Sequence, residues 1–484
     1  MDTVVRGSQL ARMLGAWHLP AGAARRPEYA VLASVVRGLL ADGRLPLGVR
    51  LPAERDLAQA LGISRTTVSA AYRELRESGH LTSRRGAGSW TALPGGHRIA
   101  TSGLGMAPED DGDLIDLGCA ALAAPPELMV AVREAVADLP AYTGRDGYSP
   151  MGLPVLREAV AQRYADRGLP TQPDQIVITN GVQHALDLVL RLLVAPGQRV
   201  LVESPTYPNA LAAFAAARAR VTSYGLAPDG WDADLLLATL RATQARLAYL
   251  IPDFHNPTGL LMDDALRERL PAAAHAAGTD LVIDESFTEL RLDGAGVPTA
   301  VAGFDRGARV LTIGGMSKPF WGGLRIGWVR AAAPLVARLA AARVSVDMAS
   351  PVLDQLVAVR LLDRGDALIS ARRLQLTQRR DALIAALRAE LPEWRFRTPD
   401  GGLSLWVELD APVSSALARA AEELGVRIAP GPRFSADGTM ERFLRLPYTL
   451  PVPDLVEAVA RLAVARRDLD RPRRYAWSSP AVVA

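Results

Sequence analysis

Apolar residues along the chain define three regions of different character. From Glu28 to about Ala92 they recur with helical spacing, whereas from residue 114 to about 466 short apolar runs alternate with Ala- and Leu-rich helical stretches. Residues 93–113 are rich in Gly, Pro and Asp, the first 27 residues show little periodicity, and residues 467–484 are polar. We therefore predict an N-terminal extension at 1–27, a helical domain at 28–92, a linker at 93–113, a larger domain at 114–466 and a C-terminal tail at 467–484.

The pattern of the larger region predicts an α/β fold. Its predicted strands are Gln175–Thr179, Val200–Glu203, Leu247–Ile251, Leu281–Asp284, Val310–Ile313 and Leu324–Val329. The predicted helices between them include Gly181–Leu193, Ala265–Ala277 and Ala332–Ala342. This alternation predicts a mainly parallel sheet with helices on both faces in a large subdomain at about 140–345, followed by a smaller α+β subdomain at about 346–466. Because ligands of such sheets bind beyond the carboxyl ends of the strands, polar residues at those ends are candidates for a site.

The N-terminal domain carries a helix–turn–helix pattern. Pro52 suits the first turn of a short helix, Gly62 turns the chain, and Ser64 can cap a second helix. The apolar face of that second helix comprises Val68, Tyr72 and Leu75. After Leu81, two arginines beside flexible glycines suit the tip of a β-ribbon, which can lie against phosphates or in the minor groove.

The charge of this domain favours a nucleic-acid partner. The whole chain has a formal net charge of only +3, so any affinity for nucleic acid must come from a local patch. Residues 28–92 contain nine arginines against six acidic residues, and a recognition helix presents its first turn to base edges. The candidate DNA contacts are therefore Arg55, Ser64, Arg65, Thr66, Thr67, Arg84, Arg85 and Gly86. The alternative is a small docking domain whose arginines are merely solvated.

Three strings of residues in this domain resemble the GntR-type winged-helix DNA-binding domain. They are Leu51-Pro-Ala-Glu-Arg55, Ser64-Arg-Thr-Thr-Val-Ser69 and Arg85-Gly-Ala-Gly88. The resemblance implies that operator DNA is contacted by Arg55, Arg65, Thr66, Thr67, Arg85 and Gly86. Ser69 stands where some members carry a further DNA-contacting arginine.

Lys318 is the only lysine of the chain, since the other basic residues are arginines. Arginine can replace lysine wherever a solvated positive charge suffices, but not where a deprotonated amine must act as a nucleophile. A coding bias against lysine explains why lysine is scarce in the chain, but not why a lysine is retained at position 318. Lys318 is therefore the first candidate for chemistry.

The remaining composition restricts where the protein works. Cys119 is the only cysteine, which forbids an intrachain disulfide and fits a reducing compartment. No uncharged apolar run reaches the roughly 18 residues of a membrane span, and His18 and Pro20 interrupt the stretch that most resembles a signal peptide. With 484 residues, 49% of them hydrophobic, the chain can form hydrophobic cores, which excludes a mainly disordered protein. We expect a cytoplasmic protein with no membrane partner and no metal site.

Four short motifs beyond the helix–turn–helix can serve one ligand. In Gly314-Gly-Met-Ser-Lys318-Pro-Phe-Trp-Gly-Gly-Leu-Arg325, a Gly-rich turn after a predicted strand presents an amine and a guanidinium, which can hold an aldehyde and a phosphate. Gly181 leaves backbone N–H groups free at a helix N-terminus, which is an anion site. Asp284 ends an apolar strand, where a buried carboxylate needs a cation such as a protonated pyridine nitrogen. Glu285 is the alternative carboxylate for this role, and we favour Asp284 because it directly ends the apolar run. Asn256, before Pro257, can bond a phenolic oxygen.

Tyr207, in Glu203-Ser-Pro-Thr-Tyr207, completes this set with a ring for stacking. Each motif alone is weak, because Asp284 can be a solvated strand end and Asn256 a plain turn residue. Together, in this order and with the sole lysine, they resemble the fold-type-I, class I/II aminotransferases, which bind pyridoxal 5′-phosphate (PLP). The resemblance implies that Lys318 forms a Schiff base with PLP, Asp284 pairs with the pyridine nitrogen, Asn256 bonds the ring oxygen and Tyr207 stacks on the ring. The implied phosphate ligands are Gly181, Val182, Ser317 and Arg325.

The same resemblance extends to two residues outside these motifs. Arg445, in Phe443-Leu-Arg-Leu-Pro-Tyr448, matches the arginine that clamps the α-carboxylate of an amino acid. Tyr148 matches a tyrosine that reaches the neighbouring subunit's phosphate, which implies a homodimer. The sequence departs from the family at Phe287, where a tyrosine usually bonds the ring oxygen, and at Gly315, where Ser or Thr is common. Losing the tyrosine hydroxyl is expected to shift the pKa of the Schiff base.

A winged helix joined to an aminotransferase-like domain resembles the MocR/GabR family of bacterial transcription regulators, here from residue 28 to about 465. This implies a PLP-dependent regulator that binds double-stranded operator DNA as a homodimer and senses PLP itself or a small amino compound. The first alternative is an active PLP-dependent aminotransferase with a secondary N-terminal domain. The second is a structural paralogue that no longer uses PLP.

Overall fold

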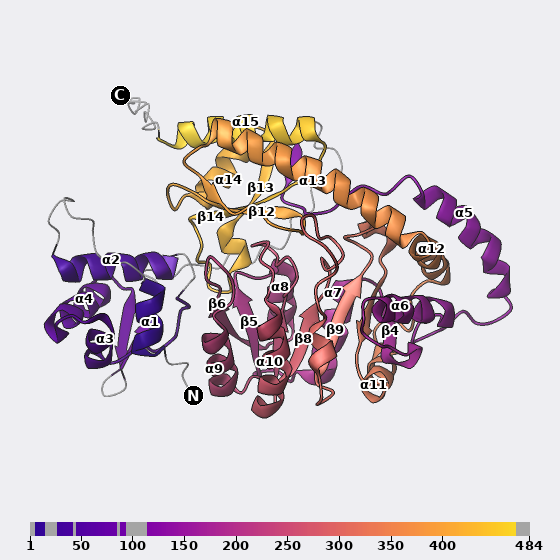
Figure 1. Cartoon of the computed structure of the whole chain (residues 1–484), viewed down its shortest axis with the longest axis horizontal. Helices are drawn as coiled ribbons and strands as arrows, with labels where there is room; N and C mark the ends of the chain where they lie inside the picture. The colour runs from indigo at the N-terminus through magenta and orange to yellow at the C-terminus, as the bar shows by residue number, and fades with distance from the viewer. Residues whose placement is uncertain (1–4, 15–26, 42–44, 85–87, 93–113, 471–484) are drawn as a thin grey trace, which may run out of the picture.

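The computed structural model describes residues 5–14, 27–41, 45–84, 88–92 and 114–470. An N-terminal domain lies beside a large domain built on one sheet, and a small domain covers one end of the large domain (Figure 1). Among the described residues, no helix is both long enough and apolar enough to cross a membrane.

The N-terminal domain is a winged helix. Its helices are α1 Gly7–Leu14, α2 Glu28–Ala41, α3 Glu54–Leu61 and α4 Arg65–Glu77, and its antiparallel wing strands are β1 Leu81–Arg84 and β2 Gly88–Thr91. The predicted apolar face of α4 is confirmed, since Val68, Tyr72 and Leu75 are buried in the domain core. Gly62 ends α3 with a left-handed φ of 67°, a conformation that glycine adopts at little cost.

The structure of this domain differs from the prediction in two places. Helix α3 begins at Glu54, so Pro52 lies before the helix, where its carbonyl accepts a hydrogen bond of 3.0 Å from the buried hydroxyl of Tyr72. The N-terminal extension contributes a helix, α1, whose Leu10 and Leu14 are buried in the winged-helix core. A helix of two turns shows too few apolar positions for its periodicity to be recognised in the sequence.

The large domain is built on a seven-stranded sheet. In spatial order its strands are β4 Ile176–Thr179, β10 Gly327–Arg330, β9 Val310–Gly315, β8 Asp280–Asp284, β7 Leu247–Leu250, β5 Arg199–Ser204 and β6 Arg220–Gly225. Neighbouring strands are parallel, except that β10 is antiparallel to both β4 and β9. The predicted mainly parallel sheet is therefore confirmed, and β6 is a strand that the sequence pattern did not predict.

Helices cover both faces of this sheet, because alternate residues of each strand point to opposite sides. In β8, Val282 packs in one apolar core, whereas Leu281 and Ile283 pack in another. The first core takes in α7 Val182–Leu193, α8 Pro208–Ala216 and α11 Ala333–Arg343. The second takes in α5 Leu128–Asp138, α6 Pro154–Asp166, α9 Ala233–Thr243, α10 Asp264–Ala277 and α12 Val352–Leu362. Short 3-10 turns are η1 Leu139–Ala141, η2 Pro173–Gln175, η3 Val301–Phe304, η4 Gly322–Leu324 and η5 Gly431–Phe434.

The strand predicted at Leu324–Val329 begins later than expected. Gly322–Leu324 forms a 3-10 turn, and Arg325 has a left-handed φ of 52°, so the strand starts only at Gly327. This reversal brings Nη2 of Arg325 within 2.9 Å of the carbonyl of Asn180, beside the start of α7. A local backbone reversal of this kind leaves no trace in an apolar pattern.

The small domain contains a five-stranded sheet beneath helices. In spatial order the strands are β11 Arg395–Phe396, β12 Ser404–Glu408, β14 Phe443–Pro447, β13 Val426–Pro430 and β3 Ile115–Leu117. The helices are α13 Gly365–Glu390, α14 Ser414–Glu423 and α15 Val452–Asp470, of which α15 continues past the predicted boundary at 466. Strand β3 pairs in parallel with β13 at the edge of the sheet. The first described residues after the predicted linker therefore belong to the small domain's sheet.

Candidate functional site

A cavity of about 180 Å³ opens where β7, β8 and β9 of the large sheet end. The structure brings most of the predicted site residues to its wall, namely Val182, Tyr207, Asn256, Asp284, Ser317, Lys318 and Arg325. They come from segments far apart in the chain that meet because parallel strands end at the same edge of a sheet.

Lys318 follows β9 and reaches into this pocket. Its Nζ donates a hydrogen bond of 2.8 Å to the carbonyl of Ala120. Burial lowers the pKa of Lys318, the positive charges of Arg445 and Arg325 lower it further, and the carboxylate of Asp284 opposes them. A lysine with a lowered pKa has more of the neutral amine that can attack an aldehyde.

Asp284 ends β8 and is held by several donors. Tyr249 Oη donates to Oδ2 at 2.6 Å, while the backbone N–H and the hydroxyl of Ser286 donate to Oδ1 at 2.9 and 2.5 Å. Burial raises the pKa of Asp284, and these hydrogen bonds oppose the rise. Glu285 instead faces away from the pocket and forms an ion pair of 3.2 Å with Arg167. The geometry therefore favours Asp284 over Glu285, and it adds Tyr249 and Ser286, which no sequence motif had indicated.

A cradle for an anion lies at the start of α7. Gly181 precedes the helix with a φ of 87°, and a Cβ there would stand only 2.8 Å from Nη2 of Arg325. The first N–H groups of a helix have no partner within the helix, and the helix dipole favours negative charge beside them. Arg325 and Ser317 line the same cavity. Gly315 lies close by, and a Cβ at this position would approach Val182 Cγ2 to 2.9 Å, so Ser or Thr would need some rearrangement here.

Tyr207, Asn256 and Phe287 line the wall of the pocket. The hydroxyl of Tyr207 accepts a hydrogen bond of 2.9 Å from Asn209, and burial raises the pKa of this tyrosine. Phe287 is buried and brings no hydroxyl to the pocket. Asn256 therefore offers the pocket an amide, whereas Phe287 offers no polar group.

Arg445 lies on β14, buried beside the pocket. Its guanidinium stacks on the Phe434 ring at 5.1 Å, Nη2 donates to the carbonyl of Gly118 at 2.5 Å, and Nη1 lies 3.5 Å from Oδ1 of Asn256. Within the described part of the chain, Nε has no hydrogen-bond partner and the other two nitrogens contact only neutral groups. Burial lowers the pKa of Arg445 to about 10. A buried cation without an anionic partner is costly, which points to an anionic ligand.

Tyr148 does not line this pocket. Its side chain is 58% exposed on the surface of its own chain.

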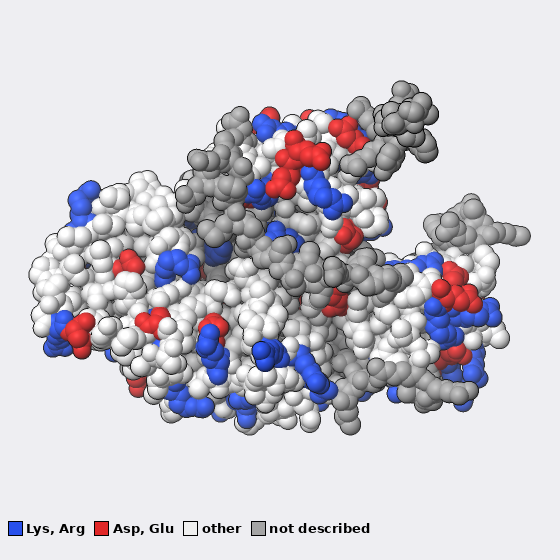
Figure 2. Space-filling model, turned by 180° about the vertical axis from the view of Figure 1, so that it is seen from behind, with Lys and Arg blue, Asp and Glu red and all other residues white. Residues whose placement is uncertain are grey.

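The predicted DNA contacts lie at the start of α3, at the start of α4 and in the wing. Ser64 caps α4 by accepting a hydrogen bond of 3.0 Å from the backbone of Thr67. Arg55 and Thr66 are exposed, and the Arg65 side chain is 72% exposed, 3.6 Å from Glu54. Arg84 ends β1, whereas Arg85 and Gly86 lie outside the described residues. Basic side chains gather on the outer part of this domain, with acidic ones beside them (Figure 2).

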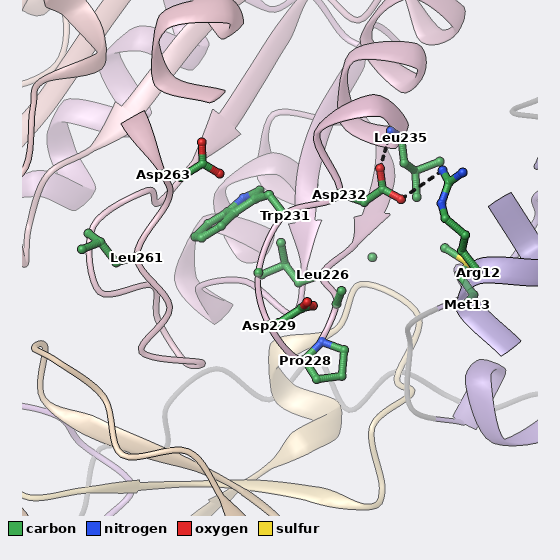
Figure 3. A pocket seen from close by; sticks show the side chains of 13 residues that line it. Arg12, Met13, Leu226, Pro228, Asp229, Trp231, Asp232, Leu235, Leu261 and Asp263 are labelled. Atoms are coloured by element: carbon green, nitrogen blue, oxygen red, sulfur yellow. Dashed lines mark hydrogen bonds and ion pairs between the residues drawn. The ribbon is translucent and has the colours of Figure 1, made fainter. Parts of the chain in front are cut away.

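The winged-helix domain contacts both other domains. A second cavity, of about 400 Å³, lies between α1 and the large domain, where Arg12 forms an ion pair of 3.4 Å with Asp232 (Figure 3). The backbone N–H of Leu47 donates to Oδ2 of Asp437 in the small domain at 3.1 Å, and burial raises the pKa of Asp437. The sequence could not predict these contacts, because they depend on how the domains sit together.

Comparisons with known proteins agree with this architecture. Residues 113–462 match the family described as aminotransferase class I and II, and residues 28–90 match the family described as bacterial regulatory proteins, gntR family. The crystal structure of alpha-aminoadipate aminotransferase from Thermus thermophilus, complexed with N-(5'-phosphopyridoxyl)-L-leucine, is 31% identical, with a TM-score of 0.68. The match covers 74% of this chain and 93% of that one.

Two relatives match almost the whole chain. The HTH-type transcriptional regulator TauR of Rhodobacter capsulatus is 29% identical over 472 residues, which cover 90% of this chain and 95% of TauR. The uncharacterized HTH-type transcriptional regulator YdfD of Bacillus subtilis is 27% identical, over 92% of this chain and 97% of its own.

Fold and pocket thus define a GntR-type winged helix fused to a PLP-dependent transferase fold of type I. The chain belongs to the aminotransferase class I and II family, in the arrangement of the MocR/GabR regulators.

Proposed function

We propose that this protein is a PLP-dependent, DNA-binding transcriptional regulator. In this proposal residues 28–92 bind operator DNA, residues 93–113 link the two parts, and residues 114–466 sense PLP or a small amino compound. The observation that carries the proposal is the fusion, in one chain, of a winged helix with a pocket that gathers an amine, a buried carboxylate and an anion cradle. TauR and YdfD, whose names describe transcriptional regulators, match across both parts.

The residues of the pocket fit PLP. Lys318 supplies an amine whose pKa burial lowers, and Asp284 supplies a buried carboxylate for a protonated ring nitrogen. Asn256 would bond the ring oxygen and Tyr207 would stack on the ring. The phosphate would lie on Gly181, Val182, Ser317 and Arg325. When bound, PLP supplies an aldehyde that condenses with amines and a ring that withdraws electrons.

Arg445 is proposed to bind the carboxylate of the effector. It is a buried guanidinium beside the pocket that contacts only neutral groups among the described residues. A carboxylate would supply the missing charge through hydrogen bonds that are stronger than those to a neutral carbonyl. This argument favours amino acids over simple amines as effectors.

Homodimerisation is proposed from Tyr148. The exposed side chain lies outside the pocket of its own chain, so it is free to reach the phosphate of a second copy. A two-fold dimer would also pair two winged helices for a palindromic operator.

DNA binding is proposed for the exposed start of α4 and for the wing. Arg65 and Thr66 would meet base edges, with Arg55 and the wing residues Arg84, Arg85 and Gly86 on the backbone or minor groove. Ser64 and Thr67 would contribute mainly by fixing the start of the helix, since the Ser64 hydroxyl caps it and the Thr67 hydroxyl bonds to the Ser64 hydroxyl. Effector control requires that the ligand bind two conformations of the protein with different affinity.

The experiment that tests the proposal is an absorbance titration of the purified protein with PLP and amino acids, run beside a binding assay on the protein's own upstream DNA. The proposal predicts a PLP band that Lys318→Ala removes, and operator binding that weakens steeply with salt. A protein without any PLP band would instead be a structural paralogue that no longer uses the cofactor.

An active aminotransferase is the second candidate. The pocket has a lysine and an aspartate, with Arg445 buried beside it, which suit transamination, and the solved aminotransferase described above is 31% identical. Steady-state assays with a panel of amino acids separate the two functions. Turnover of about 1–1000 per second would contradict a role restricted to regulation.

A further inference from the structure

The two groups of the pocket that an amino acid would engage are both held by one short piece of backbone. Arg445 Nη2 donates to the carbonyl of Gly118 at 2.5 Å, and Lys318 Nζ donates to the carbonyl of Ala120 at 2.8 Å. Between these residues lies Cys119, whose side chain is exposed. We call residues 115–120 the β3 segment.

The β3 segment is anchored at its beginning and held in place by a side chain. Ile115–Leu117 pairs with β13, and the N–H of Ile115 donates to the carbonyl of Gly425 at 2.9 Å. Oδ1 of Asp116 accepts a hydrogen bond of 2.6 Å from the N–H of Gly118. This hydrogen bond holds the Leu117–Gly118 peptide, which directly precedes the peptide that carries the Gly118 carbonyl.

A carbonyl is a weak substitute for an anion at a buried guanidinium. It satisfies one N–H of Arg445 but leaves the charge without a counter-ion among the described residues. A carboxylate offers two oxygens and a full charge, so it would displace the carbonyl. A carboxylate that pairs with both Nη nitrogens of Arg445 would compete with the Gly118 carbonyl for Nη2.

Displacement of this segment would also affect contacts outside the pocket. Residue 114 directly follows the stretch 93–113 that joins the winged helix to the rest of the chain. The partner strand β13 runs into η5, which carries the Phe434 ring under Arg445, and Asp437 shortly afterwards contacts Leu47 of the winged-helix domain. The β3 segment therefore connects the effector site with the DNA-binding domain in two ways. One is along the chain through residue 114, and the other is through its pairing with β13, which leads to Asp437.

We propose that the β3 segment is an autoinhibitory element, in which the Gly118 carbonyl occupies the carboxylate-binding position of Arg445 until an effector displaces it. The inference rests on the proposed function and specifies how the effector site is regulated. Effector affinity is then set partly by the stability of the Gly118–Arg445 contact.

The test compares two ligands and two variants. N-(5'-phosphopyridoxyl)-L-leucine carries the carboxylate, and the same compound made from isoamylamine lacks only that group. Asp116→Ala removes the acceptor that orients Gly118, whereas Asp116→Asn removes the same negative charge but retains an acceptor oxygen. We expect the leucine compound to bind Asp116→Ala about three- to tenfold more tightly than Asp116→Asn, as the loss of one competing hydrogen bond predicts. The isoamylamine compound should bind both variants equally.

Hydrogen exchange in the unsubstituted protein supplies an independent measurement. Amides of residues 115–120 should exchange faster when the leucine compound saturates the pocket than when the isoamylamine compound does. Equal affinity of the leucine compound for the two variants, or exchange that is unchanged or slower with it, would overturn the proposal. If neither compound binds the unsubstituted protein, the proposed function itself fails, and this inference fails with it.

Discussion

The first turn of α4 and the Lys318 pocket present their polar groups in opposite ways. The side chain of Arg65 is 72% exposed, and its ion pair with Glu54 is a loose 3.6 Å. In the pocket, three donors hold Asp284, and both Lys318 and Arg445 are hydrogen-bonded to backbone carbonyls. DNA brings its own dense charge, so exposed donors suffice on that surface. A small ligand brings few contacts, so its site must be organised before it arrives.

From this comparison we expect that substitution of one side chain in the pocket can abolish ligand capture completely. Lys318→Ala should abolish covalent capture of PLP, and Lys318→Arg should abolish it equally, because a guanidinium retains the charge but is not a nucleophile. Intact-mass analysis after borohydride reduction measures this directly. A residual PLP adduct in either variant would show that another nitrogen reacts.

The DNA surface should respond in a graded way. Arg65→Ala should weaken binding to the protein's own upstream DNA about tenfold or more, because this side chain is proposed to meet a base edge. Arg388→Ala changes an exposed arginine on α13 of the small domain and is the matched control. Equal losses in both variants would indicate binding through net charge alone. That result would favour the alternative of a docking domain with solvated arginines.

A pH profile examines the electrostatics of the pocket. Lys318 must be deprotonated to attack, so the rate of PLP capture should rise with pH and level off above its pKa. Burial lowers that pKa, and Arg445 lowers it further, so the midpoint should lie below the ordinary value for lysine and move up in Arg445→Met. Stopped-flow absorbance gives the midpoint. A midpoint that is unchanged in Arg445→Met would show that the two cations do not interact.

The smallest effect is expected at Phe287. Phe287→Tyr would bring a hydroxyl toward the place where Asn256 is the candidate partner of the ring oxygen. The midpoint of the pH-dependent change in the PLP absorbance band should shift by about one unit or less, because only one hydrogen bond is added. An unshifted midpoint would mean that the hydroxyl points elsewhere.

The sequence predicted the groups that carry charge and missed the groups that hold them. Lys318, Asp284 and Arg325 were recognisable because each stands in a motif at a strand end, and the structure places them around one cavity. Tyr249 and the carbonyl of Gly118 were not recognisable, because a buried tyrosine looks like core and a backbone acceptor has no sequence signal. The fold, too, was predicted only in part. The parallel sheet was predicted from its apolar runs, whereas α1 and the reversal at Arg325 depend on short local geometry.

The central claim is that occupancy of the Lys318 pocket changes the affinity for DNA. Fluorescence anisotropy on the protein's own upstream DNA, at one fixed salt concentration, tests it with the pocket empty and then saturated with N-(5'-phosphopyridoxyl)-L-leucine. The account predicts that Kd for the DNA differs by about fivefold or more between the two states, and that DNA changes the affinity of the ligand by the same factor. Identical DNA affinities, while absorbance shows the pocket to be filled, would contradict it.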